Sequence, residues 1–217
     1  KAEFIGHPLA QAIAFIPSHI TARAELGVEA SGPVLAMLPG SRQGEVRRLL
    51  PVFLAAFDRI ARVLPVVTAL IPGATPALAR DIEAAIGSRP IRVLQGQARE
   101  ALAAADSVLL ASGTAALESV LTGRPTVAAY RMNPMTYSLV KRRLKSRFVT
   151  LPNHMAGTAL VPELIQGQAN PASIAQAVLA SLREGPSASF MRHAQAIHDS
   201  LSGPVSERAA DAIGQLV

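Results

Sequence analysis

The sequence contains no cysteine and no tryptophan, and aromatic residues make up only 4% of it. Without cysteine there is no disulfide framework, no thiolate nucleophile and no cysteine-based zinc site, and this composition suits a reducing compartment. No apolar run approaches the roughly 18–20 residues that a membrane-spanning helix needs. The first eight residues, Lys1 to Pro8, lack the apolar core of a signal peptide and resemble the interior of a folded protein.

Charged residues are also sparse, at 17%, while half of the residues are hydrophobic, so the chain is expected to fold around a sizeable core. A length of 217 residues fits one large α/β domain, or one domain with a few added helices. The 21 Lys and Arg residues outnumber the 15 Asp and Glu residues, which gives a net charge of +6 and a pI near 10.7. Such a surplus attracts nucleic acid, anionic lipid or phosphorylated substrates. Charge alone does not choose among these partners, or between them and a merely solvated basic face.

Short apolar runs alternate along the chain with segments of helical periodicity. Val34–Leu38 is a continuous apolar run closed by Pro39 and Gly40, as expected for a strand buried on both faces. Strands that alternate with helices predict βαβ units, and therefore a Rossmann-like parallel sheet flanked by helices, of the α/β class. The predicted strands are Ala2–Ile5, Val34–Leu38, Val66–Ile71, Ile91–Leu94, Ser107–Ala111 and Thr126–Tyr130, with an extended piece at Phe148–Leu151 ended by Pro152. The predicted helices are 44–63, 76–86, 98–105, 114–122, 135–146, 171–184, 187–200 and 204–216.

Ligands of such sheets bind at the carboxyl ends of the strands, so the loops that follow the strands carry the candidate sites. In the first loop, Gly40 allows a sharp turn, Ser41 can cap the next helix, and Arg42 can meet a phosphate. The loop has neither the G-x-G-x-x-G spacing of a dinucleotide site nor the G-K-[ST] of a P-loop. An ordinary strand–helix turn with a surface arginine is the alternative.

The strongest candidate is the loop after Ala111, where the small residues Ser112, Gly113, Thr114 and Ala115 lead into a helix. Small side chains let a ligand approach the backbone, and the free amides at a helix start favour a diphosphate. Glu118 lies four residues after Thr114 and therefore on the same helix face, about 6 Å further along the axis. A carboxylate there can accept hydrogen bonds from a ribose diol; the alternative is a helix cap followed by a solvated glutamate.

Three further segments carry weaker signals. Gly96 lies in a loop that could offer main-chain groups to a base, Asn153 follows Pro152 on a predicted turn, and Arg131 follows the strand ending at Tyr130. The segment 135–147 combines apolar residues with the cations Lys141, Arg142, Arg143 and Lys145. Such a segment can bind anionic lipid or substrate, or it can be a solvated face; no nucleic-acid-binding motif supports a third reading. The five histidines are not spaced as a metal site, and we expect no metal.

Taken in order, these motifs resemble the lipid-A-disaccharide synthase family across essentially the whole chain. The matching stretches are Glu3–Leu9, Leu38–Arg42 with Glu45, Leu110–Glu118, Tyr130–Met132 with Pro134, Leu151–Asn153 with Ala156–Gly157, and Val161–Gln166.

The resemblance implies the C-terminal, donor-binding half of a two-domain GT-B glycosyltransferase. Its reaction joins UDP-2,3-diacylglucosamine to 2,3-diacylglucosamine 1-phosphate (lipid X) and releases UDP. The family's catalytic residues fall on Arg42, Glu118 and Asn153, and its diphosphate-facing stretch falls on Ser112, Gly113 and Thr114. No cofactor is expected.

The resemblance also implies an organisation in which residues 1–20 connect to a preceding N-terminal domain. Residues 21–185 then form the nucleotide-sugar-binding domain, and the helices of 186–217 pack back on the N-terminal domain. The acceptor site and general base would lie in that other half, so this hexosyltransferase half alone is expected to be inactive. A cytoplasmic protein on the inner face of a Gram-negative inner membrane is implied, with a homodimer possible and no nucleic-acid partner. The rivals are another UDP-sugar-dependent GT-B enzyme or epimerase, a non-catalytic nucleotide-binding module, and a basic lipid or nucleic-acid adaptor.

Overall fold

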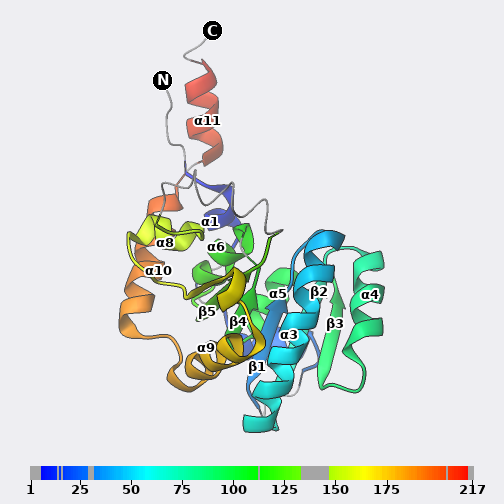
Figure 1. The fold of residues 1–217 in the computed structure, drawn as a ribbon. Coiled ribbons are helices and arrows are strands. Elements are labelled where there is room, and N and C mark those ends of the chain that lie inside the picture. The colour runs from blue at the N-terminus through cyan, green and yellow to red at the C-terminus, as the bar shows by residue number, and fades with distance from the viewer. Residues whose placement is uncertain are drawn as a thin grey trace.

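A computed structural model shows a single six-stranded sheet in the order β3-β2-β1-β4-β5-β6, with all neighbouring strands parallel (Figure 1). The structure describes residues 6–13, 15, 17–28, 32–111, 113–132, 147–203 and 205–214. The strands are β1 (Val34–Leu38), β2 (Thr68–Gly73), β3 (Ile91–Gln95), β4 (Ser107–Leu110), β5 (Thr126–Tyr130) and β6 (Glu163–Ile165). This is the Rossmann strand order, in which the chain reverses direction across the sheet between β1 and β4.

Helices cover both faces of the sheet. One face carries α3 (Gln43–Val63), α4 (Pro76–Ile86) and α9 (Pro171–Glu184). The other carries α1 (Pro8–Ala12), α2 (His19–Glu25), α5 (Ala98–Ala104), α6 (Thr114–Leu121) and α10 (Ala188–Leu201).

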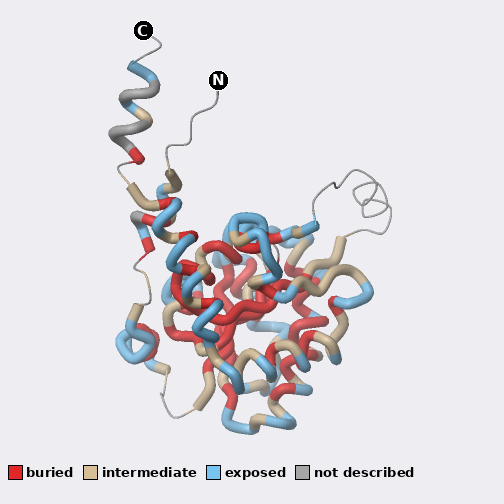
Figure 2. Tube along the Cα trace, turned by 90° about the vertical axis from the view of Figure 1, so that its left-hand side faces the viewer, coloured by how far each residue is buried: buried red, intermediate tan, exposed pale blue. Residues whose placement is uncertain are grey.

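Strand β1 shows why this arrangement follows from the sequence. Its side chains alternate between two cores, because Leu35 and Met37 pack with α3 whereas Val34 and Ala36 pack with α5 and α6. Figure 2 shows the buried residues concentrated in the sheet and on the inner faces of the helices. The α/β fold predicted from the alternating pattern is confirmed.

The structure differs from the predicted elements around residue 150. The piece predicted as extended leads into a helix, α8 (Leu151–Ala156), in which Pro152 occupies the first turn. A proline is well tolerated there, because the first N–H groups of a helix have no intrahelical partner. Strand β6 was not predicted; three half-buried residues are too few to show a pattern, and pairing with Ala128–Tyr130 defines it. The predicted elements Ala2–Ile5 and 135–146 lie outside the described residues.

Strand β2 is also shifted from its predicted position. It begins at Thr68 and continues through Pro72 and Gly73, two residues that were expected to end it. Pairing of β2 with β1 stops at Leu70, so Pro72 has only β3 as a neighbour, paired at Leu94. A proline is acceptable where one side of the strand makes no ladder hydrogen bond.

Helix α2 and the residues just before it are docked onto the sheet domain by buried arginines. Arg23 of α2 donates to the carboxylate of Asp106 at 2.6 Å and to the carbonyl of Ala104 at 2.9 Å. The same Asp106 oxygen accepts the backbone N–H of Val34 at 2.7 Å, which fixes the start of β1. Arg124 reaches the carbonyl of Pro17 at 2.7 Å. These buried polar contacts hold residues 17–25 against the sheet domain; that residues 1–20 connect to another domain stays a prediction.

Helices α10 (Ala188–Leu201) and α11 (Val205–Gly214) differ in how they pack against the domain. The buried side of α10 (Phe190, Ala194, Ile197 and Leu201) joins the core formed with α6, so this helix is packed within the domain. Helix α11 (Val205–Gly214) projects beyond the body of the domain, and Ile213 on it is 64% exposed (Figure 1). The buried side of α10 is therefore covered by its own domain. That the C-terminal helices pack on another domain stays a prediction.

Candidate nucleotide-sugar site

A cavity of about 430 Å³ lies at the carboxyl ends of β1, β2, β3 and β4. This edge of the sheet includes the switch point between β1 and β4, where α/β proteins bind their ligands. The cavity is lined by Leu38, Gly40, Ser41, Arg42, Glu45, Pro72, Ala74, Gly96, Ala98, Ala111, Gly113, Thr114, Ala115 and Glu118. Three loops selected from the sequence are thus brought to one cavity.

The loop after β1 is shaped by an interaction between its own residues. Gly40 has φ +132, and a Cβ atom there would lie 2.6 Å from the Cβ of Glu45. The Glu45 carboxylate accepts the backbone N–H of Ser41 at 3.2 Å and the guanidinium of Arg42 at 3.0 Å. The prediction that Ser41 caps the helix is wrong, because Arg42 occupies the N-cap position of α3 and no side chain caps it. Glu45 in the first turn binds the loop instead, through the N–H of the residue before the N-cap.

Helix α6 begins directly at the cavity. Gly113 occupies the N-cap position with φ 148, a conformation that favours glycine, and no side-chain oxygen caps the helix. Gly113, Thr114 and Ala115 all line the cavity. The first amides of a helix lack intrahelical acceptors and carry the positive end of the helix dipole. This part of the cavity suits an anionic group such as a diphosphate.

Glu118 lies one turn along α6 and lines the same cavity, as the spacing from Thr114 predicted. Its side chain is 19% exposed, and Arg99 lies beside it, with 3.9 Å between Oε2 of Glu118 and Nε of Arg99. Burial raises the pKa of the Glu118 carboxyl above its ordinary value, and Arg99 partly opposes that shift. A half-buried carboxylate at this point can accept hydrogen bonds from vicinal hydroxyls.

The third loop, after β3, closes the cavity at the sheet edge. Gly96 has φ 69, and its N–H donates to the carbonyl of Gly73 at 2.8 Å. Gln97 follows with φ 53 and starts α5 without a side-chain cap. This tight turn presents main-chain groups to the cavity beside Ala98.

Asn153 lies elsewhere, in a buried polar cluster. Its amide nitrogen donates to the carbonyl of Val161 at 2.8 Å and to Glu163 at 2.9 Å, and its amide oxygen accepts the N–H of Val161 at 2.7 Å. Glu163 also accepts the N–H and hydroxyl of Thr150, both at 2.7 Å. Asn153 is 1% exposed and does not line the cavity. In this structure its contacts hold the start of α8 against β6.

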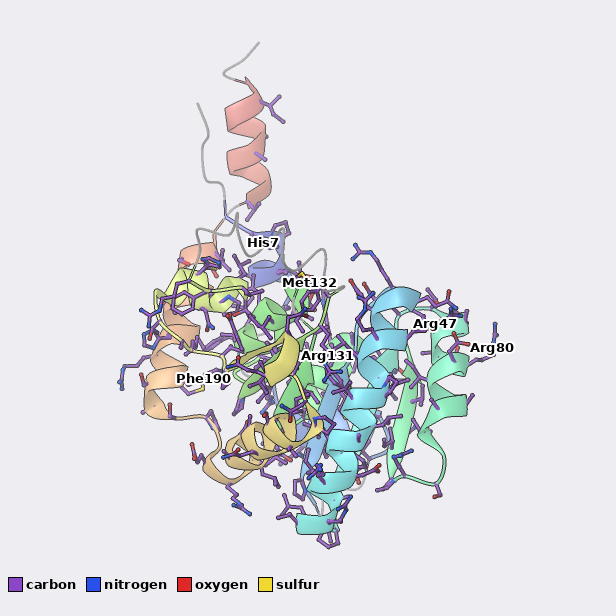
Figure 3. All side chains as sticks on the ribbon, viewed as in Figure 1. His7, Arg47, Arg80, Arg131, Met132 and Phe190 are labelled. Atoms are coloured by element: carbon purple, nitrogen blue, oxygen red, sulfur yellow. The ribbon has the colours of Figure 1, made fainter. Side chains whose placement is uncertain are left out.

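The remaining predicted residues either lie away from the cavity or fall outside the described residues. Arg131 and Met132 follow β5 (Figure 3), and the turn there is held by the side chain of Gln166, which bonds both the N–H and the carbonyl of Met132. Arg131 is half-buried and does not line the cavity. Ser112, Lys141, Arg142, Arg143 and Lys145 lie outside the described residues.

Sequence reasoning assigned no role to Glu45 or Arg99, which the structure places beside Arg42 and Glu118 respectively. An acidic residue in the first turn of a helix is favoured by the helix dipole, and this signal could have found Glu45. Arg99 carries no such signal, because it meets Glu118 only through the packing of α5 on α6. Within the described ranges, His, Asp and Glu side chains form no group of three or more that could hold a metal ion. No helix in that part of the chain is long and apolar enough to cross a membrane.

Comparison with known proteins identifies the family. Residues 1–215 match the family described as lipid-A-disaccharide synthetase. The lipid-A-disaccharide synthase of Hahella chejuensis is 40% identical over 219 residues, which covers 99% of this chain and 55% of that protein. The enzyme of Pseudomonas syringae pv. tomato is 43% identical over 221 residues, covering 99% and 56%. The chain therefore spans a little over half the length of these relatives.

Solved structures show the same fold at low sequence identity. ADP-heptose lps heptosyltransferase II of E. coli superimposes with a TM-score of 0.54 at 14% identity, covering 76% of this chain and 51% of that one. A glycosyltransferase of Rickettsia africae superimposes with a TM-score of 0.57 at 9% identity, covering 90% and 50%. The described domain has the fold of one half of a GT-B glycosyltransferase. With the family match over nearly all of its length, this chain belongs to the lipid-A-disaccharide synthetase family.

Proposed function

We propose that this chain supplies the donor-binding half of a hexosyltransferase of lipid A biosynthesis. The reaction joins UDP-2,3-diacylglucosamine to lipid X, forms the lipid A disaccharide 1-phosphate and releases UDP. The observation that carries the proposal is the cavity at the β1–β4 switch point, where the start of α6, Arg42 and Glu118 lie together. Family membership supports the substrate class.

Each group in the cavity has a role that its position supports. The amides at the start of α6 bind the diphosphate of the donor, and Glu118, one turn later, accepts hydrogen bonds from the ribose hydroxyls. Arg42, 81% exposed at the cavity rim, adds a cation that stabilises the negative charge developing on the departing UDP. This half therefore binds the donor and stabilises its leaving group.

Attack by the acceptor hydroxyl needs a general base and an acceptor site, which the cavity residues do not provide. A general base must lie within hydrogen-bond reach of the acceptor hydroxyl, and the cavity residues offer no free base besides Glu118. We place the base and the acceptor site in the part of the relatives' length that this chain does not match. The half that binds the donor is therefore inactive alone in this proposal.

The acceptor and the donor of this reaction are both lipids, so the enzyme is proposed to work peripherally on the inner membrane of a Gram-negative bacterium. Arg131, Lys141, Arg142, Arg143 and Lys145 are the cations proposed to meet anionic lipid or substrate. Helix α11 is proposed to pack on the other domain or on a second copy of the chain, because it projects beyond the body of the domain and Ile213 on it is exposed (Figure 1).

Calorimetric titration with UDP tests the donor site. Arg42→Ala and Glu118→Ala are each expected to weaken UDP binding by about tenfold or more, because each removes a charged hydrogen-bonding group worth roughly 1.5–3 kcal/mol. Arg192→Ala, which removes an exposed cation from α10, is the matched control and should bind UDP like the unmodified chain. If neither variant changes the affinity, the site is elsewhere.

Donor competition in the full-length protein tests the substrate. Turnover with UDP-2,3-diacylglucosamine should exceed turnover with UDP-N-acetylglucosamine. A preference for the unacylated sugar would reject the lipid A reaction in favour of another UDP-sugar enzyme. Binding of UDP without turnover of either sugar by the full-length protein would indicate a nucleotide-binding module.

A further inference from the structure

Arg99 faces Glu118 from outside the nucleotide cavity. It is the second residue of α5, and its guanidinium Nε lies 3.9 Å from Oε2 of Glu118. Arg99 does not line the cavity that holds Glu118; it lines a neighbouring cavity of about 420 Å³ between α2 and α5. The two cavities follow one another along α6, since Glu118 lines the first and Thr122, one turn later, lines the second. Arg99 can therefore act on Glu118 without occupying the space of the ligand.

The charged form of the Glu118 carboxyl depends on a neighbouring cation. Its side chain is 19% exposed, and burial disfavours the charged form of the carboxyl. The other two charged side chains of the cavity, Arg42 and Glu45, are paired with each other at 3.0 Å. The ionic interaction that favours the charged form of Glu118 comes from Arg99.

The other elements packed against α6 offer no substitute. Helices α8 and α10 both contact α6. Strands β4 and β5 and helix α5 also contact α6. Besides Arg99, the charged and titratable side chains of these elements are Glu100, Tyr130, His154, Arg192, His193, His198 and Asp199. Two of them are engaged within α10, since His193 bonds the carbonyl of Ser189 and Asp199 accepts from Gln195. Among the described residues, Arg99 is the charged group that lowers the pKa of the Glu118 carboxyl against the effect of burial.

We propose that Arg99 is a positioning residue of the donor site, which holds the Glu118 carboxylate in its charged form and in place for the ribose diol. This inference rests on the proposed function, because it assumes that Glu118 meets a ribose. Arg99 itself touches neither the nucleotide nor the sugar. Arg99 affects nucleotide binding only by acting on the Glu118 carboxylate.

The test is UDP affinity measured from pH 5.5 to pH 8 in Arg99→Gln, with Arg192→Gln as a control that removes an equal charge from α10. Arg99→Gln removes the interaction that lowers the Glu118 pKa, so the carboxyl takes up a proton at a higher pH and UDP affinity falls earlier on acidification. We expect about tenfold weaker binding than the unmodified chain at pH 5.5, and about twofold or less at pH 8. Arg99→Lys keeps a cation there and should restore most of the affinity.

Two further measurements distinguish an effect of Arg99 through Glu118 from a general effect of the Arg99 charge on UDP binding. In a Glu118→Gln background, which has no ionisable group at that position, Arg99→Gln should change UDP affinity little. With 2′,3′-dideoxy-UDP, which lacks the diol, Arg99→Gln should also have little effect. The inference is overturned if Arg99→Gln binds UDP normally at every pH, or weakens UDP and the dideoxy analogue equally. In both cases the donor site itself stands, whereas failure of the unmodified chain to bind UDP would remove the proposed function as well.

Discussion

The carboxylate of Glu45 reaches back across the first turn of α3 and accepts the backbone N–H of Ser41 at 3.2 Å. Its other oxygen accepts the guanidinium of Arg42 at 3.0 Å. One side chain thus fixes both the backbone that lines the cavity and the cation at its rim. Because Gly40 has no Cβ, this carboxylate can pack directly against the turn.

Replacing Glu45 with alanine should destabilise the start of α3. The N–H of Ser41 would lose its acceptor, and an acidic group would be removed from the positive end of the helix. We expect the free energy of unfolding in urea to fall by about 0.5–2 kcal/mol, as for the loss of a helix cap. Glu83→Ala, at an exposed position of α4, is the control and should change stability by less than about 0.5 kcal/mol. Equal stabilities of the two variants would contradict the proposed role of Glu45.

Glu118→Gln should stabilise the domain at neutral pH while weakening UDP binding. Burial raises the pKa of Glu118 in the folded state above its ordinary value of 4.5. The stability contributed by this group is therefore fully present below pH 4.5 and is lost as the pH rises through the folded-state pKa. In urea unfolding from pH 4 to pH 8, the stability of Glu118→Gln relative to the unmodified chain should therefore rise with pH. A variant less stable than the unmodified chain at pH 8 would show that the carboxylate is stabilised by its surroundings.

Asn153→Ala should act mainly on stability. It would leave both the N–H and the carbonyl of Val161 without partners in a buried site, at a cost of roughly 2–4 kcal/mol. Chemical unfolding measures this cost, and glycosyl transfer by the full-length protein measures any catalytic role. A large loss of turnover with unchanged stability would favour the catalytic role that the family resemblance implies for Asn153.

Asp106→Ala should be much more damaging than Asp58→Ala. The first substitution leaves Arg23, whose side chain is 10% exposed, without its carboxylate, at a cost of roughly 2–4 kcal/mol. Asp58 pairs with Arg89 at the surface, where both side chains are about a third exposed, so its loss should cost about 1 kcal/mol or less. Urea unfolding at pH 7 compares the two. Similar costs would mean that the Arg23 contact does not hold α2 in place.

Asp58 also gives a pH dependence of the opposite sign to that of Glu118. The hydrogen bond from Arg89 lowers the pKa of Asp58 below its ordinary value of 3.8. Its contribution is present above pH 3.8 and is lost as the pH falls through the folded-state pKa. In Asp58→Ala the stability difference from the unmodified chain should therefore shrink in acid.

The sequence by itself determined the α/β class, five of the six strands of the described sheet, and three of the loops that line the cavity. These features are local: apolar runs such as Val34–Leu38 mark buried strands, and glycines such as Gly113 mark turns into helices. The spacing of Glu118 from Thr114 also follows from helix geometry alone, and it correctly placed both residues on the cavity.

Only the tertiary structure decided which groups meet across the chain. The order of the strands brings the loops after Leu38, Gln95 and Leu110 to one cavity, and the packing of α5 on α6 sets Arg99 beside Glu118. Tertiary packing also buries Asn153, and pairing with β5 is what makes residues 163–165 a strand. Local patterns cannot specify these contacts, because each depends on backbone elements far apart in sequence that packing alone brings together.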